Sequence, residues 1–362
     1  ATEEVVKHVD RCLSCLSCMS TCPSGVHYMH LVDHARAHIE ETYERSWHDK
    51  LLRRVLGAIL PYPGRFRVAM LGAMLAKPLG PALGALPLVG GRLKAMLALA
   101  PSKLPSRSPM EGPQSFAPAA APAGKRVAIL SGCAQPVLDP AINEATIRLL
   151  TRHGVEVVLP KGEGCCGALV HHMGREHDAH AFARANIDAW TAEIEGKGLD
   201  AILITTSGCG TTIKDYGFMF RNEPAYAAKA ERVSALAKDV TEFVATLDLV
   251  AVRDVAMPIA YHSACSMQHG QQLKDGPKRL LSGVGFSVKE APEGHICCGS
   301  AGVYNILQPE IAGQLRERKV GNIQKTKPVL VATGNIGCMT QIGTGTRIPI
   351  RHTVELLAEA YG

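Results

Sequence analysis

The sequence predicts an α/β protein in which two related parallel-sheet repeats follow a helical N-terminal segment. Three observations support this prediction. A pair of adjacent cysteines follows a single cysteine by 32 residues, and the whole pattern occurs twice, 132 residues apart. Short apolar runs alternate with helix-like segments around both copies, as in parallel sheets covered by helices. Before these repeats lie four closely spaced cysteines and a long region rich in Leu, Ala and Gly.

Residues 1–45 contain the first cysteine group and are expected to be helical. The spacing is Cys-x2-Cys-x2-Cys-x3-Cys-Pro, formed by Cys12, Cys15, Cys18 and Cys22. This is the spacing of bacterial ferredoxins, so we expect a [4Fe–4S] cluster here rather than a zinc knuckle. In two-cluster ferredoxins the last cysteine ligates the other cluster. Cys22 therefore either closes its own cluster or serves one whose motif lies upstream of Ala1, and the start at Ala favours the second reading.

Residues 46–100 are apolar, basic and free of cysteine. Residues 51–110 hold nine Lys or Arg and no Asp or Glu. One helical face gathers Leu51, Leu52, Val55, Leu56, Ile59 and Leu60. A basic amphipathic segment of this kind can lie on an anionic membrane surface. Packing on a partner subunit and packing on its own domain are the alternatives. Residues 101–124 hold six prolines and are expected to form an extended linker.

The two repeats are expected to span residues 125–250 and 251–362. In the first, we predict strands at 127–130, 155–159 and 201–205 and helices at 141–153 and 175–195. In the second, we predict strands at 258–262, 286–289 and 329–332 and helices at 277–284 and 309–324. Each cysteine then falls just beyond the end of a strand, where open α/β sheets place their ligand sites.

Each repeat offers four cysteines as candidate metal ligands. They are Cys133, Cys165, Cys166 and Cys209 in the first repeat, and Cys265, Cys297, Cys298 and Cys338 in the second. Adjacent cysteines reach two irons of a cluster more readily than they share one small ion. Gly167 and Gly299 would let the backbone approach the site closely. Zinc held by four thiolates and a redox-active dithiol are the alternatives for each repeat.

Several polar residues flank these cysteines. They are His171, His172, His262 and His295, together with Ser131 and Ser263. The histidines can donate hydrogen bonds to cluster sulfurs or carry protons, and ordinary loop histidines are the alternative. The serines can donate to thiolates, although a serine at a strand end needs no such role.

Composition and missing motifs exclude several classes of protein. Hydrophobic residues make up 46% and charged residues 20%, which is a globular balance. The net charge of +6 is concentrated in the basic middle region, so we expect no nucleic-acid binding. We find no secretory signal and no apolar run long enough to span a membrane. A dinucleotide-binding or phosphate-binding glycine motif is also absent, so we expect neither flavin nor NAD in this chain.

Residues 125–362 resemble the Cys-Cys-Gly family of heterodisulfide reductases and of iron–sulfur subunits of flavin dehydrogenases. The chain as a whole resembles the iron–sulfur subunits of bacterial glycolate oxidases, also called glycolate dehydrogenases. The segments that carry this resemblance are CLSCLSCMSTCPSGVHY, GCAQPVL, GCCGALVHH, ANIDAW, SGCGTTIKDYG, CCGSAGVYN and NIGC. Two departures matter. The family's earlier cysteine run is absent, and Thr206 and Asn335 stand where relatives often have a fifth cysteine for a noncubane cluster.

The resemblance implies an electron-transfer subunit with no catalytic residues of its own. Flavin-containing dehydrogenase subunits would oxidise glycolate to glyoxylate, and this chain would pass the electrons toward a quinone or another acceptor. It would be cytoplasmic, peripheral on the cytoplasmic face of the inner membrane. The equivalent subunit of a lactate or glycerol-3-phosphate dehydrogenase complex is one alternative. A heterodisulfide-reductase-like catalytic subunit and a structural module with zinc in both repeats are the others.

Overall fold

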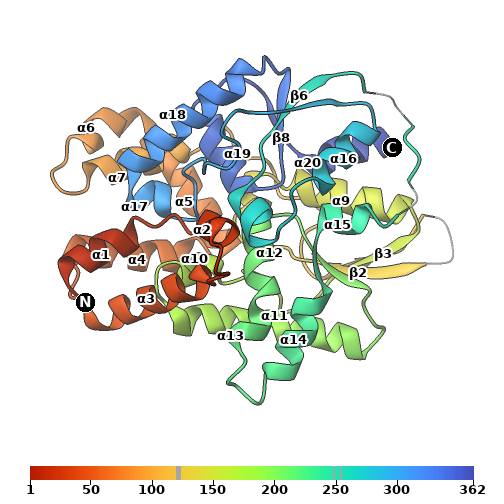
Figure 1. Cartoon of the computed structure of the whole chain (residues 1–362), viewed down its shortest axis with the longest axis horizontal. Coiled ribbons are helices and arrows are strands. Elements are labelled where there is room, and N and C mark those ends of the chain that lie inside the picture. The colour runs from red at the N-terminus through yellow and green to blue at the C-terminus, as the bar shows by residue number, and fades with distance from the viewer. Residues whose placement is uncertain (120–123, 248, 253–254) are drawn as a thin grey trace.

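The computed structural model describes residues 1–119, 124–247, 249–252 and 255–362. Two sheets form the repeats, and helices cover both of them (Figure 1). The first sheet has the strand order β1-β3-β2-β4-β5, and the second has the order β7-β6-β8-β9. Neighbouring strands are parallel except β1 and β3, which are antiparallel. The predicted fold class is therefore confirmed.

Helices dominate the first hundred residues. They are α1 (Glu3–Asp10), α2 (Ser17–Thr21), α3 (Tyr28–Thr42), α4 (Trp47–Ile59), α5 (Pro63–Ala76), the 3-10 turn η1 (Lys77–Leu79), α6 (Gly80–Gly84) and α7 (Gly90–Leu99). The strand β1 (Gln114–Phe116) follows and forms one edge of the first sheet. The proline-rich segment 101–124 thus contributes a strand, and its residues 120–123 lie outside the described ranges.

The first repeat contains four parallel strands and the helices that connect them. Its elements are β2 (Lys125–Ile129), α8 (Gln135–Leu138), α9 (Ala141–Arg152), β3 (Val155–Leu159), α10 (Ala168–His171), α11 (Glu176–Glu195), β4 (Ala201–Ile204), α12 (Ser207–Lys214), α13 (Tyr216–Met219), α14 (Ala227–Leu236), β5 (Ala237–Asp239) and α15 (Val240–Val244). The expected boundary with the second repeat, near residue 250, adjoins residues 248 and 253–254, which lie outside the described ranges.

The second repeat has the same strand arrangement. Its elements are β6 (Pro258–Tyr261), the π-helical turn η2 (Ser266–Gly270), α16 (Gly276–Gly283), β7 (Ser287–Glu290), α17 (Tyr304–Leu307), α18 (Pro309–Lys325), β8 (Leu330–Thr333), α19 (Ile336–Gly343), β9 (Ile350–His352) and α20 (Thr353–Tyr361). In both repeats, the predicted strands and helices occur in the predicted order, with ends within two residues of the prediction.

Each repeat also ends in a strand and a capped helix that the sequence patterns did not reveal. The strands β5 and β9 are only three residues long, too short for a clear alternation of apolar and polar residues. Both lead directly into a capping box at the start of the next helix. Asp239 and Glu242 form the box of α15, and His352 and Glu355 form that of α20. The internal repeat therefore extends to the end of the chain.

The two repeats share one hydrophobic core. Ile142 and Leu149, both on α9 of the first repeat, pack with Ile259 and Tyr261 on β6 of the second. The helix α20 also packs along α9. Because this core takes side chains from both repeats, neither repeat buries all of its apolar surface alone.

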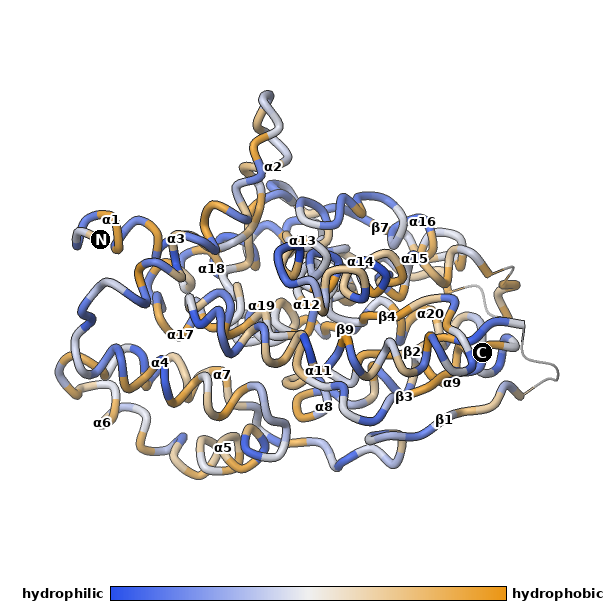
Figure 2. Tube along the Cα trace, turned by 90° about the horizontal axis from the view of Figure 1, so that it is seen from below, coloured by the Kyte–Doolittle hydropathy of each residue, from blue (hydrophilic) through white to orange (hydrophobic). Residues whose placement is uncertain are grey.

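A buried ion-pair network connects helix α4 to other helices of the same chain. Asp49 accepts hydrogen bonds from Arg53 at 2.9 Å and from Arg92 at 2.8 Å. Arg53 also donates to Asp10 at 3.2 Å, which joins α4 to α1. Leu56 supplies an apolar contact with only 3% of its surface exposed. In Figure 2, α2 projects from one side of the molecule and α5 lies on the opposite side.

Candidate metal centres

In the first repeat, the loops that follow β2, β3 and β4 bring four thiols together. The contact with Cys165, together with burial, holds the pKa of Cys133 well above its usual value. The contact with Cys165 lowers the pKa of Cys166, but the contact with Cys209 and burial outweigh it. These mutual effects link the four thiols in one buried group. All twelve cysteines of the chain lie in the described ranges and are free thiols.

The second repeat assembles its four thiols in the same way. The Sγ atoms of Cys298 and Cys338 lie 3.4 Å apart. The contact with Cys297, together with burial, holds the pKa of Cys265 well above its usual value. The amide of Gly299 donates to Cys297 Sγ at 3.3 Å, just as Gly167 in the first repeat donates to Cys165 at 3.4 Å. The two sites are therefore built on the same local geometry.

A glycine must follow each cysteine pair. Gly167 has φ +84° and Gly299 has φ +88°, a region that favours glycine. An added Cβ at Gly167 would lie 2.9 Å from the carbonyl oxygen of Ala179, and one at Gly299 would lie 2.6 Å from that of Ala312. The long helices α11 and α18 thus pack directly on the two loops. This explains why Cys-Cys-Gly occurs in both repeats.

The N-terminal cysteine loop lies against the second repeat. Burial raises the pKa of the Cys15 thiol. The thiols of Cys265, Cys12 and Cys18 lie near enough to add to this rise. Ser20 forms a hydrogen bond of 2.7 Å with His269 Nδ1 in η2, which fixes α2 on the same repeat. The first cysteine group therefore adjoins the thiols of the second repeat.

The backbone of this loop is locally strained, and a buried arginine holds it in place. Ser14 and Leu16 adopt positive φ values of 47° and 60°, which are unfavourable for residues other than glycine. Arg36, which is 7% exposed, donates to the Ser14 hydroxyl at 2.5 Å and to the Cys12 carbonyl at 2.7 Å. Hydrogen bonds to a charged donor are strong and offset this local strain. Arg36 is therefore a positioning residue that sequence reasoning missed.

Cys22 is placed differently from the other three cysteines of its run. The backbone N–H groups of Val26 and Ser24, assisted by the Tyr28 hydroxyl, lower the pKa of its thiol. Its Sγ lies 3.9 Å from the Tyr28 hydroxyl oxygen. The thiols that raise the pKa of Cys15 do not include Cys22. The structure brings Cys12 and Cys18 close to Cys15, whereas the contacts of Cys22 are with Val26, Ser24 and Tyr28.

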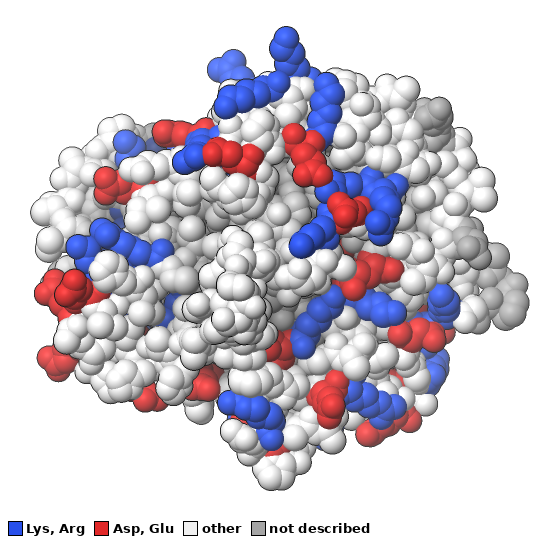
Figure 3. All heavy atoms as spheres, viewed as in Figure 1, with Lys and Arg blue, Asp and Glu red and all other residues white. Residues whose placement is uncertain are grey.

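The loop around α2 is the most prominent projection of the molecule. Figure 2 shows it standing out from the body. Residues 13–28 contain no Asp, Glu, Lys or Arg. In Figure 3 the corresponding protrusion is uncharged, and mixed positive and negative side chains surround it.

The two positions where relatives have a fifth cysteine carry hydrogen bonds instead. The hydroxyl of Thr206 donates to Gln135 at 2.7 Å. Asn335 caps α19 by accepting from the Cys338 amide at 3.1 Å, and its Nδ2 donates to the Ser207 hydroxyl at 2.9 Å. Both side chains are therefore committed to local structure. Neither supplies a thiolate, in agreement with the four cysteines counted for each repeat.

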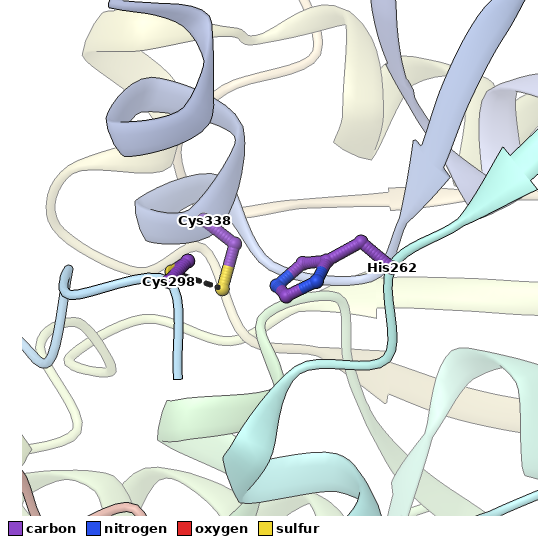
Figure 4. Close-up of side chains that lie close together, drawn as sticks. All are labelled: His262, Cys298 and Cys338. Carbon is purple, nitrogen blue, oxygen red and sulfur yellow. Dashed lines mark hydrogen bonds between the residues drawn. The ribbon is translucent and has the colours of Figure 1, made fainter. Parts of the chain in front are cut away.

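One histidine in the second repeat faces the thiols. Figure 4 shows the ring of His262, which follows β6, pointing toward Cys298 and Cys338. The potential ligand atoms of these three residues all lie within 4.8 Å of one another. His262 is only 3% exposed. Burial, with a contribution from the charge of Lys319, lowers the pKa of His262 to about 3, so its ring is neutral.

A buried lysine distinguishes the two repeats as well. Lys319 on α18 is 2% exposed, and its Nζ donates to the carbonyls of Glu293 and Gly294 at 3.0 and 3.3 Å. Burial lowers its pKa, and the thiols of the second repeat oppose that effect. In the first repeat, the neutral Asn186 on α11 forms the equivalent contacts, with Gly164 and with the Cys165 carbonyl. Only the second of these two environments contains a cation.

The other predicted polar residues are placed differently, and the hydroxyl of Ser263 is buried without a hydrogen-bond partner among the described residues. His171 and His172 face the carboxylate of Asp33 at 3.9 and 3.7 Å. His295 is exposed. The amide of Ser131 donates to Glu163, a buried carboxyl whose pKa rises to about 7 because of that burial. Of the four flanking histidines, His262 is the one whose ring joins the cysteine group.

The donor set fits an iron–sulfur cluster in each repeat. Four converging thiols at the ends of parallel strands match the ligands that such clusters require. The residues that would hold them are the four cysteines of each repeat, with Cys12, Cys15 and Cys18 at the N-terminal loop. A bound cluster would supply a one-electron redox centre. Four thiols also suit zinc, so the donor atoms alone do not select the metal.

Comparison with known proteins agrees with this architecture. The cysteine-rich domain family CCG matches residues 127–214 and 259–343, which are the two repeats. The glycolate oxidase iron-sulfur subunit of Escherichia coli is 37% identical over 99% of this chain and 83% of its own length. The probable glycolate oxidase iron-sulfur subunit of Bacillus subtilis is 29% identical over 99% of this chain and 84% of its own.

A second group of relatives is more distant. The lactate utilization protein A of Bacillus licheniformis is 26% identical over 64% of this chain and 98% of its own length. The fold and the thiol groups define a cysteine-rich protein of the Cys-Cys-Gly class. Within that class, the chain belongs to the family of glycolate oxidase iron–sulfur subunits.

Among the described residues, no helix combines the length and the apolar character needed to cross a bilayer.

Proposed function

We propose that this chain is the electron-transfer subunit of a complex that oxidises glycolate to glyoxylate. Flavin-containing subunits carry out the oxidation, and this chain receives the electrons in its metal centres. The family membership supports the class of complex. The single observation that carries the electron-transfer role is the contact between the Cys15 loop and the Cys265 site. Neighbouring redox centres within one protein provide a route for electrons.

The projecting α2 loop supports the proposal that electrons enter the chain at this loop. This loop is uncharged and exposed, and it contains the outermost candidate ligands, Cys18 and Cys22. A flavin-containing subunit that contacts the loop would bring its flavin near the N-terminal cluster. In this proposal, electrons move from the α2 loop to the second repeat. The N-terminal cluster is a [4Fe–4S] cluster, and the metal in each repeat is iron rather than zinc.

An apolar cavity on the far side of the site supports a quinone as the acceptor. The cavity has a volume of about 190 Å³ and is lined by α4, α5 and α7 together with residues next to the cysteines of both repeats. Ala134 follows Cys133, and Gly337 precedes Cys338. A cavity of about 150 Å³ is known to accept a six-membered ring. Ser300 and Asn305 provide polar groups that suit the carbonyl oxygens of such a ring.

The outer face of α5 supports attachment to a membrane. Val68, Leu71 and Leu75 are 69%, 49% and 83% exposed, although all three are apolar. The same helix lines the cavity with Ala69 and Ala73. A helix that is apolar on its exposed face, in a region rich in Lys and Arg, suits the surface of an anionic bilayer. A lipid-soluble quinone would then reach the cavity from the inner membrane, with the chain on its cytoplasmic face.

The test uses the complex purified anaerobically with this chain or with its Cys15→Ser variant. Glycolate, lactate and glycerol 3-phosphate are supplied in turn, and reduction of a short-chain quinone and of a hydrophilic dye is followed. We expect glycolate to be the preferred substrate and quinone reduction to require Cys15. A preference for lactate would assign the chain to the complexes of the more distant relatives.

Metal analysis of the same preparations separates electron transfer from a structural role. We expect iron and acid-labile sulfide in excess of one cluster per chain. Zinc in both repeats, or quinone reduction that is unchanged in Cys15→Ser, would refute the proposed route.

A further inference from the structure

In the second repeat, the side chain of His262 has a buried polar atom without a partner and lies beside the thiols. Nε2 of His262 has no hydrogen-bond partner among the described residues, although the residue is 3% exposed. A buried imidazole nitrogen that lacks a partner is energetically costly. Its ring points toward the Sγ atoms of Cys298 and Cys338 (Figure 4). The ligand atoms of the three residues lie within 4.8 Å of one another, a span that one metal ion can bridge.

The backbone fixes this orientation. The amide of His262 donates to the carbonyl of Ala332 on β8 at 2.8 Å, which continues the sheet ladder by one residue. At the equivalent place in the first repeat, Leu130 donates to Leu203 on β4 at 3.0 Å. The two residues therefore occupy the same structural position, one turning an imidazole toward its thiols and the other an alkyl group. The repeats share a backbone but differ in their donor atoms.

We infer that His262 is a metal ligand and that the second repeat binds its metal through thiolates and one imidazole. The inference deepens the proposed function and rests on the presence of metal in this repeat. It does not depend on glycolate as the substrate. The first repeat, with Leu130 in the corresponding position, binds through thiolates alone. Both repeats have four cysteines, so the imidazole is an additional neutral donor. Where it binds an iron in place of one of the four thiolates, that iron has a neutral ligand instead of an anionic one, which raises the reduction potential.

The buried cation of Lys319 acts in the same direction. Its ammonium group lies near the thiols of the second repeat and favours the more reduced, more negatively charged state of a bound centre. The second repeat therefore has the higher reduction potential of the pair. This is also the repeat that adjoins Cys15.

The test labels the histidines of the full chain with nitrogen-15 and uses the complex purified anaerobically. If the second-repeat metal is iron, pulsed electron paramagnetic resonance detects a directly bound nitrogen as a strong hyperfine coupling that changes with the isotope. If it is zinc, X-ray absorption at the zinc edge detects one nitrogen at about 2.0–2.1 Å. We expect a bound nitrogen in the unmodified chain. Its absence would overturn the inference.

Three variants assign the nitrogen. We expect His262→Leu, which copies the first repeat, to lose the nitrogen signal and to bind the second-repeat metal at least about tenfold more weakly. The His262→Cys variant should retain the metal with sulfur ligands only, so it reports on ligation even if His262→Leu does not fold. The exposed His295→Leu is the matched control and should keep both metal and signal. A nitrogen signal that persists in His262→Leu and in His262→Cys would overturn the assignment.

Discussion

The imidazole Nε2 of His352 donates a hydrogen bond of 2.7 Å to the carbonyl oxygen of Thr205. Thr205 directly follows β4 of the first repeat, and His352 ends β9, the last strand of the second. The other ring nitrogen accepts from the amide of Val354 at 3.2 Å and caps α20. One neutral histidine therefore links the two repeats and starts the final helix. Its protonation would remove the cap and bury a charge.

The first prediction concerns acid stability at this link. Burial lowers the pKa of His352 to about 4, below the value of about 6.5 for an unfolded histidine. The contribution of neutral His352 to the stability of the folded state is complete above pH 6.5. It is lost as the pH falls toward 4, and the total loss is about 3 kcal/mol. In His352→Asn, the amide oxygen retains the helix cap but does not reach Thr205. We expect this variant to be less stable by about 1–3 kcal/mol at pH 7.5.

Denaturant unfolding at pH 7.5, 6.0 and 4.5 under anaerobic conditions measures this difference. The gap between the two proteins should narrow as the pH falls. A constant gap across the three pH values would contradict the prediction.

The second prediction concerns the equivalent cap in the first repeat. There, a rise in pH lowers the stability of the folded state instead of raising it. Burial raises the pKa of Asp239 to about 6, and Glu242 contributes to the rise. Because this value exceeds that of an unfolded aspartate, the folded state loses stability as the pH rises from about 4 to 6. Asp239→Asn keeps an oxygen that accepts from the Thr241 amide, a contact of 2.9 Å. We expect the variant to gain about 1–3 kcal/mol at pH 7.5 and nothing at pH 4.

Thermal unfolding at the two pH values tests this expectation, with Asp188→Asn as an exposed control on α11. An equal gain at both pH values would show that the charge of Asp239 is not responsible.

The third prediction separates Cys22 from the other N-terminal cysteines. Cys15 lies among Cys12, Cys18 and Cys265, whereas Cys22 lies beside Tyr28. We expect Cys15→Ser to lose the iron of one cluster, about four atoms per chain. Cys22→Ser should retain that iron if its thiol serves a different centre. Iron and sulfide analysis of the two variants, purified in parallel, provides the comparison, and equal losses would show that Cys22 closes the same cluster.

The fourth prediction concerns the apolar cavity. In Ala73→Phe a phenyl ring enters the space between α5 and the two repeats. Overfilling a packed site costs about 1–3 kcal/mol, so affinity for a short-chain quinone should fall by about tenfold or more. Val68→Phe adds the same ring to the exposed face of α5 and serves as the control.

Glycolate-driven reduction of the quinone and of a hydrophilic dye is measured for both variants. Loss of the quinone rate alone would support the cavity as the binding site. An unchanged quinone rate in Ala73→Phe would exclude the cavity while leaving the role of the chain in glycolate oxidation intact.

Much of this architecture follows from the sequence because the cysteine spacing and the strand periodicity occur twice. The strand β4 is a continuous apolar run, and β2 and β8 each contain a shorter buried apolar run, which are clear in a sequence. The strands β5 and β9 escaped prediction because three residues show no period, and each is completed by a neighbouring strand. The strand β1 was hidden by prolines, since an edge strand tolerates them near its ends.

The candidate ligands and their grouping within each repeat were predictable, but the contact between the N-terminal loop and the second repeat was not. Spacing identifies all twelve cysteines, yet only the fold places Cys15 beside Cys265. His262 had a recognisable signal, since it stands one residue beyond a strand and its repeat counterpart is Leu130. Arg53 belongs to the segment predicted to be basic and amphipathic, and the structure buries it beside Asp49. Such pairing depends on residues distant in sequence, and periodicity carries no information about them.

The helices α2 and α5 lie on opposite sides of the molecule (Figure 2). If α5 rests on a bilayer, the α2 loop points away from it, into the aqueous phase. A dehydrogenase bound at that loop would then be held off the lipid by the thickness of this chain. Its active site would stay open to a small, water-soluble acid, while the quinone that accepts the electrons would stay in the membrane. In that arrangement the chain would act as a spacer as well as an electron carrier, and its orientation would decide which reactant meets which phase.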